Sequence, residues 1–380
     1  MRVYTWQMML DNYGTWLEID LSILKKNFVL LSELSGTNVM PIVKANAYGH
    51  GLERVAVAFE EAGAEWFGVA RIEEALALRE VGIKVRILVL GYTPPSRIPH
   101  AIQENISLTV YDPLVAEAYS EYANGLKKKV NLHVKVESGM GRLGVLMKDA
   151  VGFIENIHGQ TNLLLEGVFT HLACADEPEK EVTEKQVSQF EVLLNELRSK
   201  DRLPEIVHAA NSAGAINYPG TRFNLVRSGI ALYGQPPSAE TKLPEGVRSA
   251  IFWKTRLISI KDLPPGHGIS YGHTYHTKKT ECIGVIAVGY GDGLRRQPGN
   301  YVLLHGKKVP IIGNVCMDQC MIKLEEVPDA KIGDEVIIFG EQNGAEITSS
   351  EIANNWNTIN YEVLCGLAAR IPRNYLNIKN

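Results

Sequence analysis

The stretch Asn38-Val-Met-Pro-Ile-Val-Lys-Ala-Asn-Ala-Tyr-Gly-His-Gly51 contains a short apolar run that ends in a lysine and a glycine-containing turn. A buried parallel strand has this pattern, a few apolar residues bounded by turn-forming ones. A dinucleotide-binding sheet would require Gly-x-Gly-x-x-Gly directly after such a strand, and residues 44–51 do not supply it. The stretch therefore favours a parallel α/β fold in which Lys44 occupies a strand end.

Further runs of the same kind alternate with helical patterns. Ile72–Val81 has acidic residues in its first turn, and Val182–Leu197 has apolar residues at helical spacing. Strands and helices in alternation over about 215 residues fit a (β/α)8 barrel. A doubly wound sheet is the alternative, because alternation alone does not separate the two folds. The expected strands are Asn38–Val43, Glu65–Ala70, Val85–Gly91, Ser107–Asp112, Asn131–Glu137, Leu165–His171, Ile206–Asn211 and Leu225–Leu232.

A segment rich in proline and glycine, Gly234–Gly246, is typical of a linker. Beyond it, short strand-like runs are separated by Gly, Pro and Asp turns, and helical signal is scarce. We therefore expect a barrel domain over residues 15–240 and a mainly β domain over residues 247–380. Asp20 is a suitable N-cap for the first amphipathic helix, Leu21–Leu34.

The composition excludes several classes of protein. A net charge of −4, with acids and bases interspersed, gives no basic stripe for nucleic acid. No apolar run approaches the length of a membrane span, and residues 1–14 lack a signal-peptide pattern. The five cysteines are few and odd in number, which favours the reducing cytoplasm. Cys316 and Cys320 lack a second pair, so we expect no metal site.

Reactive groups of a barrel lie at the carboxyl ends of its strands. The expected strand ends carry Lys44, Arg142, His171, Ser212 and Arg227. This set suggests an anionic ligand and a lysine able to form an imine. Each residue has a structural alternative when taken alone. Lys44 could extend its ammonium into solvent, His171 could be a core histidine, and Ser212 could begin a helix. Asn211 could likewise begin a helix, and Tyr48 and Tyr361 could be core aromatics.

Lys135 presents a separate problem of charge. Side chains alternate along Asn131–Glu137, so His133, Lys135 and Glu137 share the face that points into the barrel. An unpaired buried ammonium is costly. If the strand is correctly placed, Lys135 is therefore paired, neutral or chemically modified.

Nearly the whole chain resembles the alanine racemase family. The lysine motif, the arginine motif and the downstream Ser-Tyr-Gly, found together in the order of the family, make the resemblance specific. Glu137-Ser138 is a small departure, since the family commonly has Asp-Thr there. The matching motifs are Pro41–Gly51, Gly139–Gly144, Thr170–Ala173, His208–Ala213, Arg227–Gly234, Ser270–Gly272, Gly289–Gly293, Cys316–Asp318 and Tyr361–Val363.

The resemblance implies a pyridoxal 5'-phosphate enzyme that interconverts L-alanine and D-alanine for peptidoglycan. Lys44 would hold the cofactor as a Schiff base and serve the D-enantiomer, while Tyr271 of a second subunit would serve the L-enantiomer. Such an enzyme is a head-to-tail homodimer with shared active sites. Arg227 would face the pyridine nitrogen, in a hydrogen-bond chain with His171 and Tyr271.

The remaining roles also follow from the resemblance. Arg142 and Met317 would contact the substrate, and Lys135 is carbamylated in some members of the family. The cofactor contacts would be completed by Tyr48, Asn211, Ser212, Gly229, Ile230 and Tyr361.

Other activities compete with this reading. A barrel-type decarboxylase would place a carboxylate where Arg227 stands, and a pyridoxal-phosphate carrier protein would lack the β domain. A serine or broad-range racemase stays open as the alternative. Tyr361 favours alanine, because some serine-using relatives carry Asn there.

Overall fold

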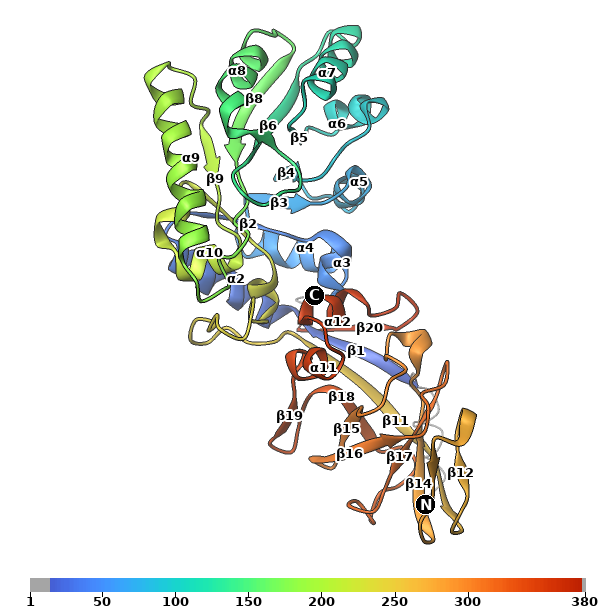
Figure 1. Ribbon diagram of the computed structural model, residues 1–380. Coiled ribbons are helices and arrows are strands. Elements are labelled where there is room, and N and C mark those ends of the chain that lie inside the picture. The colour runs from blue at the N-terminus through green and yellow to red at the C-terminus, as the bar shows by residue number, and fades with distance from the viewer. Residues whose placement is uncertain (1–13, 378–380) are drawn as a thin grey trace. The chain divides into compact units, whose positions relative to one another are not determined.

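The computed structural model describes residues 14–377 (Figure 1). The expectation that the N-terminus is no signal peptide falls largely on residues 1–13, which lie outside the described part. The described part divides into two compact units, one formed by Ser22–Arg248 and the other by residues 14–21 and 249–377. No helix in the described part is long and apolar enough to cross a membrane.

The unit Ser22–Arg248 is built on parallel strands that close into a ring. Six strands pair in one sheet, β10 pairs with β2, and an isolated bridge from Ile42 to Gly68 joins β2 to β3. On the other side, the N–H of Arg227 donates to the carbonyl of Ala210 at 3.0 Å, which joins β10 to the end of β9. The ring confirms the predicted barrel and excludes the open sheet. In sheet order it contains β3 (Trp66–Val69), β4 (Arg86–Val89), β5 (Ile106–Val110), β6 (Val130–Glu137), β8 (Leu163–Phe169), β9 (Ile206–His208), β10 (Leu225–Ser228) and β2 (Asn38–Pro41).

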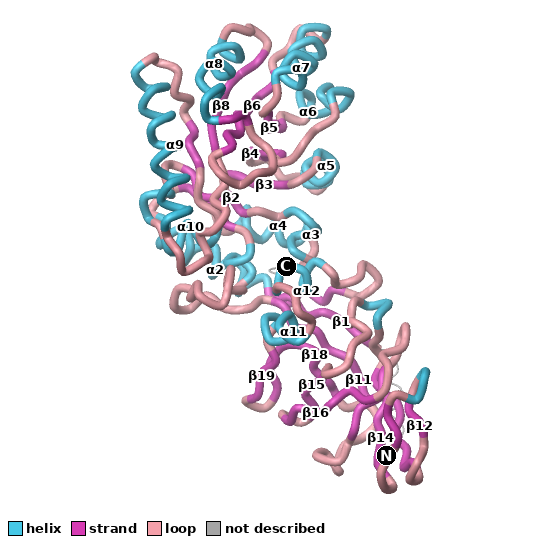
Figure 2. The backbone as a smooth tube through the Cα atoms, in the orientation of Figure 1, coloured by secondary structure: helices cyan, strands magenta, loops and turns pink. Residues whose placement is uncertain are grey.

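Helices cover the outer side of these strands (Figures 1 and 2). Their buried residues recur at helical spacing, as in α9, where Phe190, Leu193 and Leu197 are buried. Asp112 caps α7, because its carboxylate accepts hydrogen bonds from two N–H groups of the first turn. The helices are α2 (Leu21–Ser35), α4 (Leu52–Glu61), α5 (Ile72–Glu80), α6 (Ile98–Gln103), α7 (Pro113–Gly125), α8 (Met147–His158), α9 (Glu181–Ser199) and α10 (Ser212–Asn217).

The second unit is mainly β, as predicted. Its long strand β11 (Ile251–Leu263) pairs with both β14 and β18, so that the sheet curls back on itself. Ile269, Ile283 and Ile312 form one of its buried clusters. The ring around β11 contains β14 (Glu281–Ile286), β17 (Cys320–Lys323), β16 (Lys307–Ile312), β15 (Tyr301–Leu304) and β18 (Glu335–Gln342).

The first described strand, β1 (Thr15–Asp20), belongs to this β unit. It pairs antiparallel with β11 and parallel with β20 (Arg373–Leu376). We expected the barrel to begin at residue 15, and the structure corrects this boundary. Strand pairing over more than 230 residues of sequence is invisible to local patterns, which place β1 with the helix that follows it.

The segment 234–246 has no regular helix or strand, as expected of a connection. It is nevertheless anchored to the barrel unit. Thr241 is buried and accepts a hydrogen bond from Asn217 at 3.1 Å, and Ser238 donates to the carbonyl of Asp176 at 2.7 Å.

Candidate active site

Lys44 lies just beyond β2, at the carboxyl end of the strand, and begins a left-handed turn. Residues 45–48 all have φ between 52° and 57°. A left-handed backbone costs an L-residue about 1–2 kcal/mol. Two side chains support the turn. The carboxylate of Glu74 accepts a hydrogen bond from the N–H of Ala45 at 2.7 Å, and the side chain of Asn46 accepts one from the N–H of Leu52 at 2.9 Å. Strain held in place by specific contacts is common at functional sites.

An anion-binding corner lies beyond β10, where the fold predicts a phosphate site. Ser212 Oγ accepts hydrogen bonds from the N–H groups of Gly229 at 2.9 Å and Ala231 at 3.3 Å. A Cβ at position 229 would lie 2.5 Å from the hydroxyl of Tyr48, so only glycine fits there. Ile230 lies within the same loop and is buried. Backbone N–H groups gathered with two hydroxyls suit a phosphate.

Arg227 on β10 is 3% exposed and is held at several points. Its Nη1 donates to Nδ1 of His208 at 2.8 Å. Its Nη2 contacts the carbonyls of Thr170 and Ala209, each at 2.8 Å, and Nδ1 of His171 at 3.1 Å. Burial lowers the pKa of Arg227 to about 9, so the guanidinium is charged at neutral pH.

The guanidinium has more N–H groups than acceptors among the described residues. None of the described residues accepts a hydrogen bond from Nε of Arg227. This N–H group can therefore donate to a ligand. A neutral ring nitrogen of a ligand would provide that acceptor.

The guanidinium also fixes the tautomer of His208. Because Arg227 can only donate, Nδ1 of His208 must accept, and its proton lies on Nε2. That Nε2 lies 2.9 Å from Nδ1 of His133, which therefore accepts in turn. The remaining N–H of His133 faces Glu166 at 3.8 Å. The result is a one-way chain of donors through the barrel interior.

The three buried histidines near Arg227 are neutral: His133, His171 and His208. Burial and the charge of Arg227 lower the pKa of His171 and His208 well below the usual value. Burial, reinforced by the positive charges of Arg86 and Arg227, lowers the pKa of His133 to about 3. Since Nδ1 of His171 accepts from Arg227, its Nε2 carries the proton and can donate to an oxygen.

Lys135 points into the barrel and is 5% exposed, as the alternation of β6 predicts. No carboxylate among the described residues pairs with its ammonium, which lies 5.7 Å from the ring centre of Phe169. Glu137 instead accepts from the N–H groups of Gly139 at 2.6 Å and Arg142 at 3.1 Å. Burial, with the charges of Arg142 and Arg227, lowers the pKa of Lys135 to about 8.

Asn211 acts as a helix cap in this structure. Its Oδ1 accepts from the N–H of Gly214 at 2.8 Å, at the start of α10. This is the structural alternative that the sequence left open. Its cap holds Ser212 at the first position of the helix, beside the anion-binding corner.

Tyr271, Met317 and Tyr361 belong to the β unit, whereas the residues described so far belong to the barrel unit. Tyr271 and Met317 are strongly exposed, at 71% and 52%. Tyr361 is in α12 (Asn360–Cys365). Tyr271 borders a cavity of about 650 Å³, whose other lining residues include His267, Ile269 and Cys316.

Two features were not foreseen from the sequence. The chain through His208, His133 and Glu166 joins three strands, and only the inward alternation of β6 hinted at it. The left-handed turn after Lys44 also escaped notice, because alanine and tyrosine rarely adopt positive φ.

The described residues fit pyridoxal phosphate, the cofactor that the resemblance implies. The corner at Ser212 suits its phosphate, and Lys44 supplies the amine. The ring nitrogen could accept a hydrogen bond from Nε of Arg227, which has no acceptor among the described residues. The cations Lys44, Lys135, Arg142 and Arg227 also favour an anionic ligand, because the charges of the other three lower the pKa of Lys135 more than Glu137 raises it.

Comparisons with known proteins match both units. The model of the alanine racemase N-terminal domain matches residues 19–237, and that of the C-terminal domain matches residues 250–375. The alanine racemase of Symbiobacterium thermophilum is 41% identical over 95% of this chain and 97% of its own. That of Halothermothrix orenii is 42% identical over 96% of this chain and 97% of its own.

Solved structures agree. The crystal structure of alanine racemase from Bacillus anthracis with bound L-Ala-P has a TM-score of 0.91 at 40% identity, covering 97% of this chain and 96% of that one. Alanine racemase of Clostridium difficile 630 also has a TM-score of 0.91, at 38% identity, covering 96% of each chain. The chain belongs to the alanine racemase family.

Proposed function

We propose that this protein is an alanine racemase that interconverts L-alanine and D-alanine and supplies D-alanine for peptidoglycan. The observation that carries the proposal is the buried Arg227, whose spare Nε–H is a donor where a decarboxylase would have a carboxylate. A permanently charged donor leaves a ring nitrogen unprotonated. Pyridoxal phosphate, when bound, supplies the electron sink that makes the Cα proton of the amino acid labile.

Lys44 is the attachment point of the cofactor, and the hydroxyls of Ser212, Tyr48 and Tyr361 bind its phosphate. The N–H groups of Gly229 and Ile230 complete that contact. The corner at Ser212 supports this assignment, because its N–H groups already meet one oxygen there. Arg142 holds the substrate carboxylate, and Asn211 supports the cofactor through its cap on α10.

Racemisation requires proton transfer on both faces of Cα, and hence two acid–base groups. Lys44 serves the D-enantiomer and Tyr271 the L-enantiomer. His171 donates from Nε2 to the phenolic oxygen of Tyr271, which favours loss of the phenolic proton. Its tautomer, set by Arg227, supports this role.

Tyr271 and Met317 complete the site of a second subunit in a head-to-tail homodimer. Their exposure supports this arrangement, because it leaves both side chains able to contact a second subunit. Five cysteines, none of them paired, support a cytoplasmic location.

Lys135 is carbamylated in the working enzyme. Its pKa of about 8 leaves part of the amine neutral at neutral pH. The neutral Nζ attacks the carbon of carbon dioxide, an N–C bond forms, and one proton is released to solvent. The resulting anion replaces a repulsive cation beside Arg142 and accepts a charge-assisted hydrogen bond from it.

The test is incubation of the purified holoenzyme with single L-amino acids, followed by separation of enantiomers. D-Alanine should accumulate until its concentration equals that of L-alanine, and L-serine should racemise more slowly. Faster reaction of serine would favour the broad-range alternative, and no racemisation would refute the proposal. Borohydride reduction and peptide mapping should place the pyridoxyl group on the peptide containing Lys44; labelling of another lysine would overturn its role.

A further inference from the structure

Tyr271 lies at the tip of a short hairpin. Its strands β12 (Gly268–Ile269) and β13 (Tyr275–His276) pair antiparallel, and its tip includes one turn of 3-10 helix, Tyr271–His273. Such a short hairpin is marginal by itself. Contacts from outside the hairpin therefore matter for the position of its tip.

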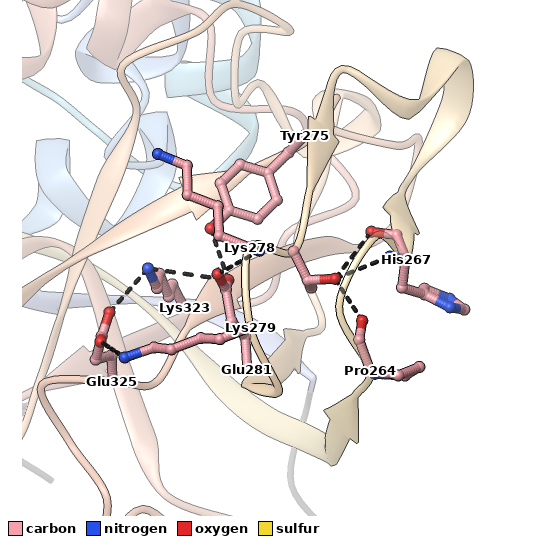
Figure 3. A network of polar contacts seen from close by, with 9 residues as sticks. Pro264, His267, Tyr275, Lys278, Lys279, Glu281, Lys323 and Glu325 are labelled. Atoms are coloured by element: carbon pink, nitrogen blue, oxygen red, sulfur yellow. Dashed lines mark hydrogen bonds and ion pairs between the residues drawn. The ribbon is translucent and has the colours of Figure 1, made fainter.

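The base of the hairpin is well anchored (Figure 3). Tyr275 donates to Glu281 at 2.6 Å, and Glu281 lies 3.9 Å from the ammonium of Lys323. Thr277 donates to the carbonyl of Pro264 at 2.5 Å. These contacts fix residues 275–281 but do not reach the tip.

The backbone of the tip is strained at Ser270, directly before Tyr271. Ser270 has φ 62° and ψ −175°, a region that essentially only glycine occupies. Gly272 and His273 follow with φ of 72° and 44°. A serine persists in such a conformation only where its surroundings over-determine it.

Asn314 supplies that restraint from two sides. Ser270 Oγ donates to the carbonyl of Asn314 at 2.5 Å, and Nδ2 of Asn314 donates to the carbonyl of Tyr271 at 2.7 Å. The thiol of Cys316 lies 3.3 Å from the same Ser270 hydroxyl. A Cβ at Gly313 would lie 2.8 Å from the carbonyl of Ile269, so the two chain segments are in direct contact.

The same segment leads into the loop that carries Met317. The N–H of Tyr290 donates to the carbonyl of Cys316 at 3.0 Å, and the N–H of Gly291 donates to the carbonyl of Met317 at 2.9 Å. Arg370 donates to both Asp292 and Asp318 at 2.8 Å. The turn before Tyr271 is thus tied to a loop that is itself held firmly.

We propose that Ser270 and Asn314 are positioning residues, which hold the phenol of Tyr271 at a fixed place relative to Met317. This inference rests on the proposed role of Tyr271 as the base for L-alanine. The strained backbone aims the tyrosine, and the hydrogen bonds of Ser270 and Asn314 stabilise that backbone. Loss of either bond lets the turn relax, and the phenol moves away from the Cα proton of L-alanine.

Four variants and a control test this proposal in the full-length holoenzyme. Ser270→Ala removes the hydroxyl and keeps the strain, whereas Ser270→Gly removes both. Asn314→Asp keeps the side-chain shape but cannot donate to Tyr271. Thr277→Val is the matched control, since it removes a hydroxyl bound to a carbonyl at the base of the same hairpin. Tyr271→Phe removes the proposed base itself.

The first readout is loss of deuterium from Cα of labelled L- and D-alanine in single turnovers. Ser270→Ala and Asn314→Asp should slow loss from L-alanine on the order of tenfold more than loss from D-alanine. Ser270→Gly should show a smaller asymmetry, because glycine adopts the turn without strain. Thr277→Val should change both directions equally. If Ser270→Ala and Asn314→Asp slowed deuterium loss from L-alanine and from D-alanine to the same extent, the proposal would be overturned.

The second readout is amide hydrogen exchange in the same holoenzyme. Ser270→Ala and Asn314→Asp should speed exchange in the peptide covering residues 270–274, and Thr277→Val should not. If amide exchange in residues 270–274 did not change in these two variants, the proposal that Ser270 and Asn314 hold the turn would be overturned. If Tyr271→Phe slowed deuterium loss from L-alanine and D-alanine equally, the proposed role of Tyr271 would fail. Amide hydrogen exchange would still show whether Ser270 and Asn314 hold the turn.

Discussion

At the scale of single residues, charge placement determines the chemistry of the barrel unit. Arg227 is buried and charged, and it imposes a neutral acceptor role on the rings of His171 and His208. The ammonium of Lys135 lies 5.7 Å from the ring centre of Phe169, over which the guanidinium of Arg227 also lies, at 5.2 Å. One permanently charged donor therefore sets the protonation of the groups around it.

Arg227→Glu should slow racemisation and raise the yield of pyruvate per turnover. A carboxylate would keep the ring nitrogen of the cofactor protonated, which favours protonation away from Cα and hence transamination. Arg227→Gln is the control, because it removes the charge without adding a carboxylate. An unchanged pyruvate yield in Arg227→Glu would contradict the role given to Arg227.

Removal of carbon dioxide should lower the activity of the enzyme, and bicarbonate should restore it. Lys135→Ala should lack this response, because it has no amine to modify. Density at Lys135 should show a planar three-atom extension beyond Nζ that contacts Arg142. An unmodified ammonium paired with a carboxylate would disprove carbamylation and leave the racemase assignment intact.

At the scale of elements, the strand ends combine strain and buried polar chains. The left-handed turn 45–48 follows β2. Hydrogen bonds link Arg227 on β10 to His208 on β9, and His208 to His133 on β6. Glu166 on β8 lies 3.8 Å beyond His133, and burial raises its pKa. Such features stabilise one arrangement only when every partner is present.

Ala45→Gly should stabilise the protein by up to about 1 kcal/mol, because it relieves strain at an exposed residue with φ 53°. Ala77→Gly in α5 is the matched control. It should destabilise by about 1 kcal/mol, since its backbone is helical. Urea unfolding measures both. A loss of stability in Ala45→Gly equal to that in Ala77→Gly would show that the turn is unstrained.

The barrel unit should lose stability as pH falls below about 6.5. The pKa of His133 is lowered to about 3 in the folded state, so the unfolded chain binds more protons between those values. Stability is therefore fully present above the unfolded pKa and declines on acidification. His133→Gln should flatten this dependence, and the exposed His158→Gln should not. Equal slopes in both variants would contradict the burial argument.

At the scale of the whole molecule, the proposed base and the cofactor lysine lie in separate units. A homodimer with shared sites predicts complementation between variants. Lys44→Ala and Tyr271→Phe should each be impaired, and a co-expressed heterodimer should contain one intact site. Its activity should rise to about half that of the native dimer. No recovery in a purified heterodimer would show that each site is formed within one subunit.

Local sequence patterns predicted the strands of the barrel, the mainly β region and the strand-end positions of three residues, because strand periodicity and the strand-end rule are short-range properties. Lys44, His171 and Arg227 were placed correctly at strand ends for this reason. The other proposed site residues came from the resemblance to the family.

Other features depend on contacts between distant parts of the chain. The pairing of β1 with β11, the donor chain from Arg227 to His133 and the clamp of Asn314 on Ser270 all join residues far apart in sequence. The left-handed turn at 45–48 is local but runs against the preferences of its residues. Contacts between distant segments, not local propensity, stabilise these features, so they become visible only when the chain is folded.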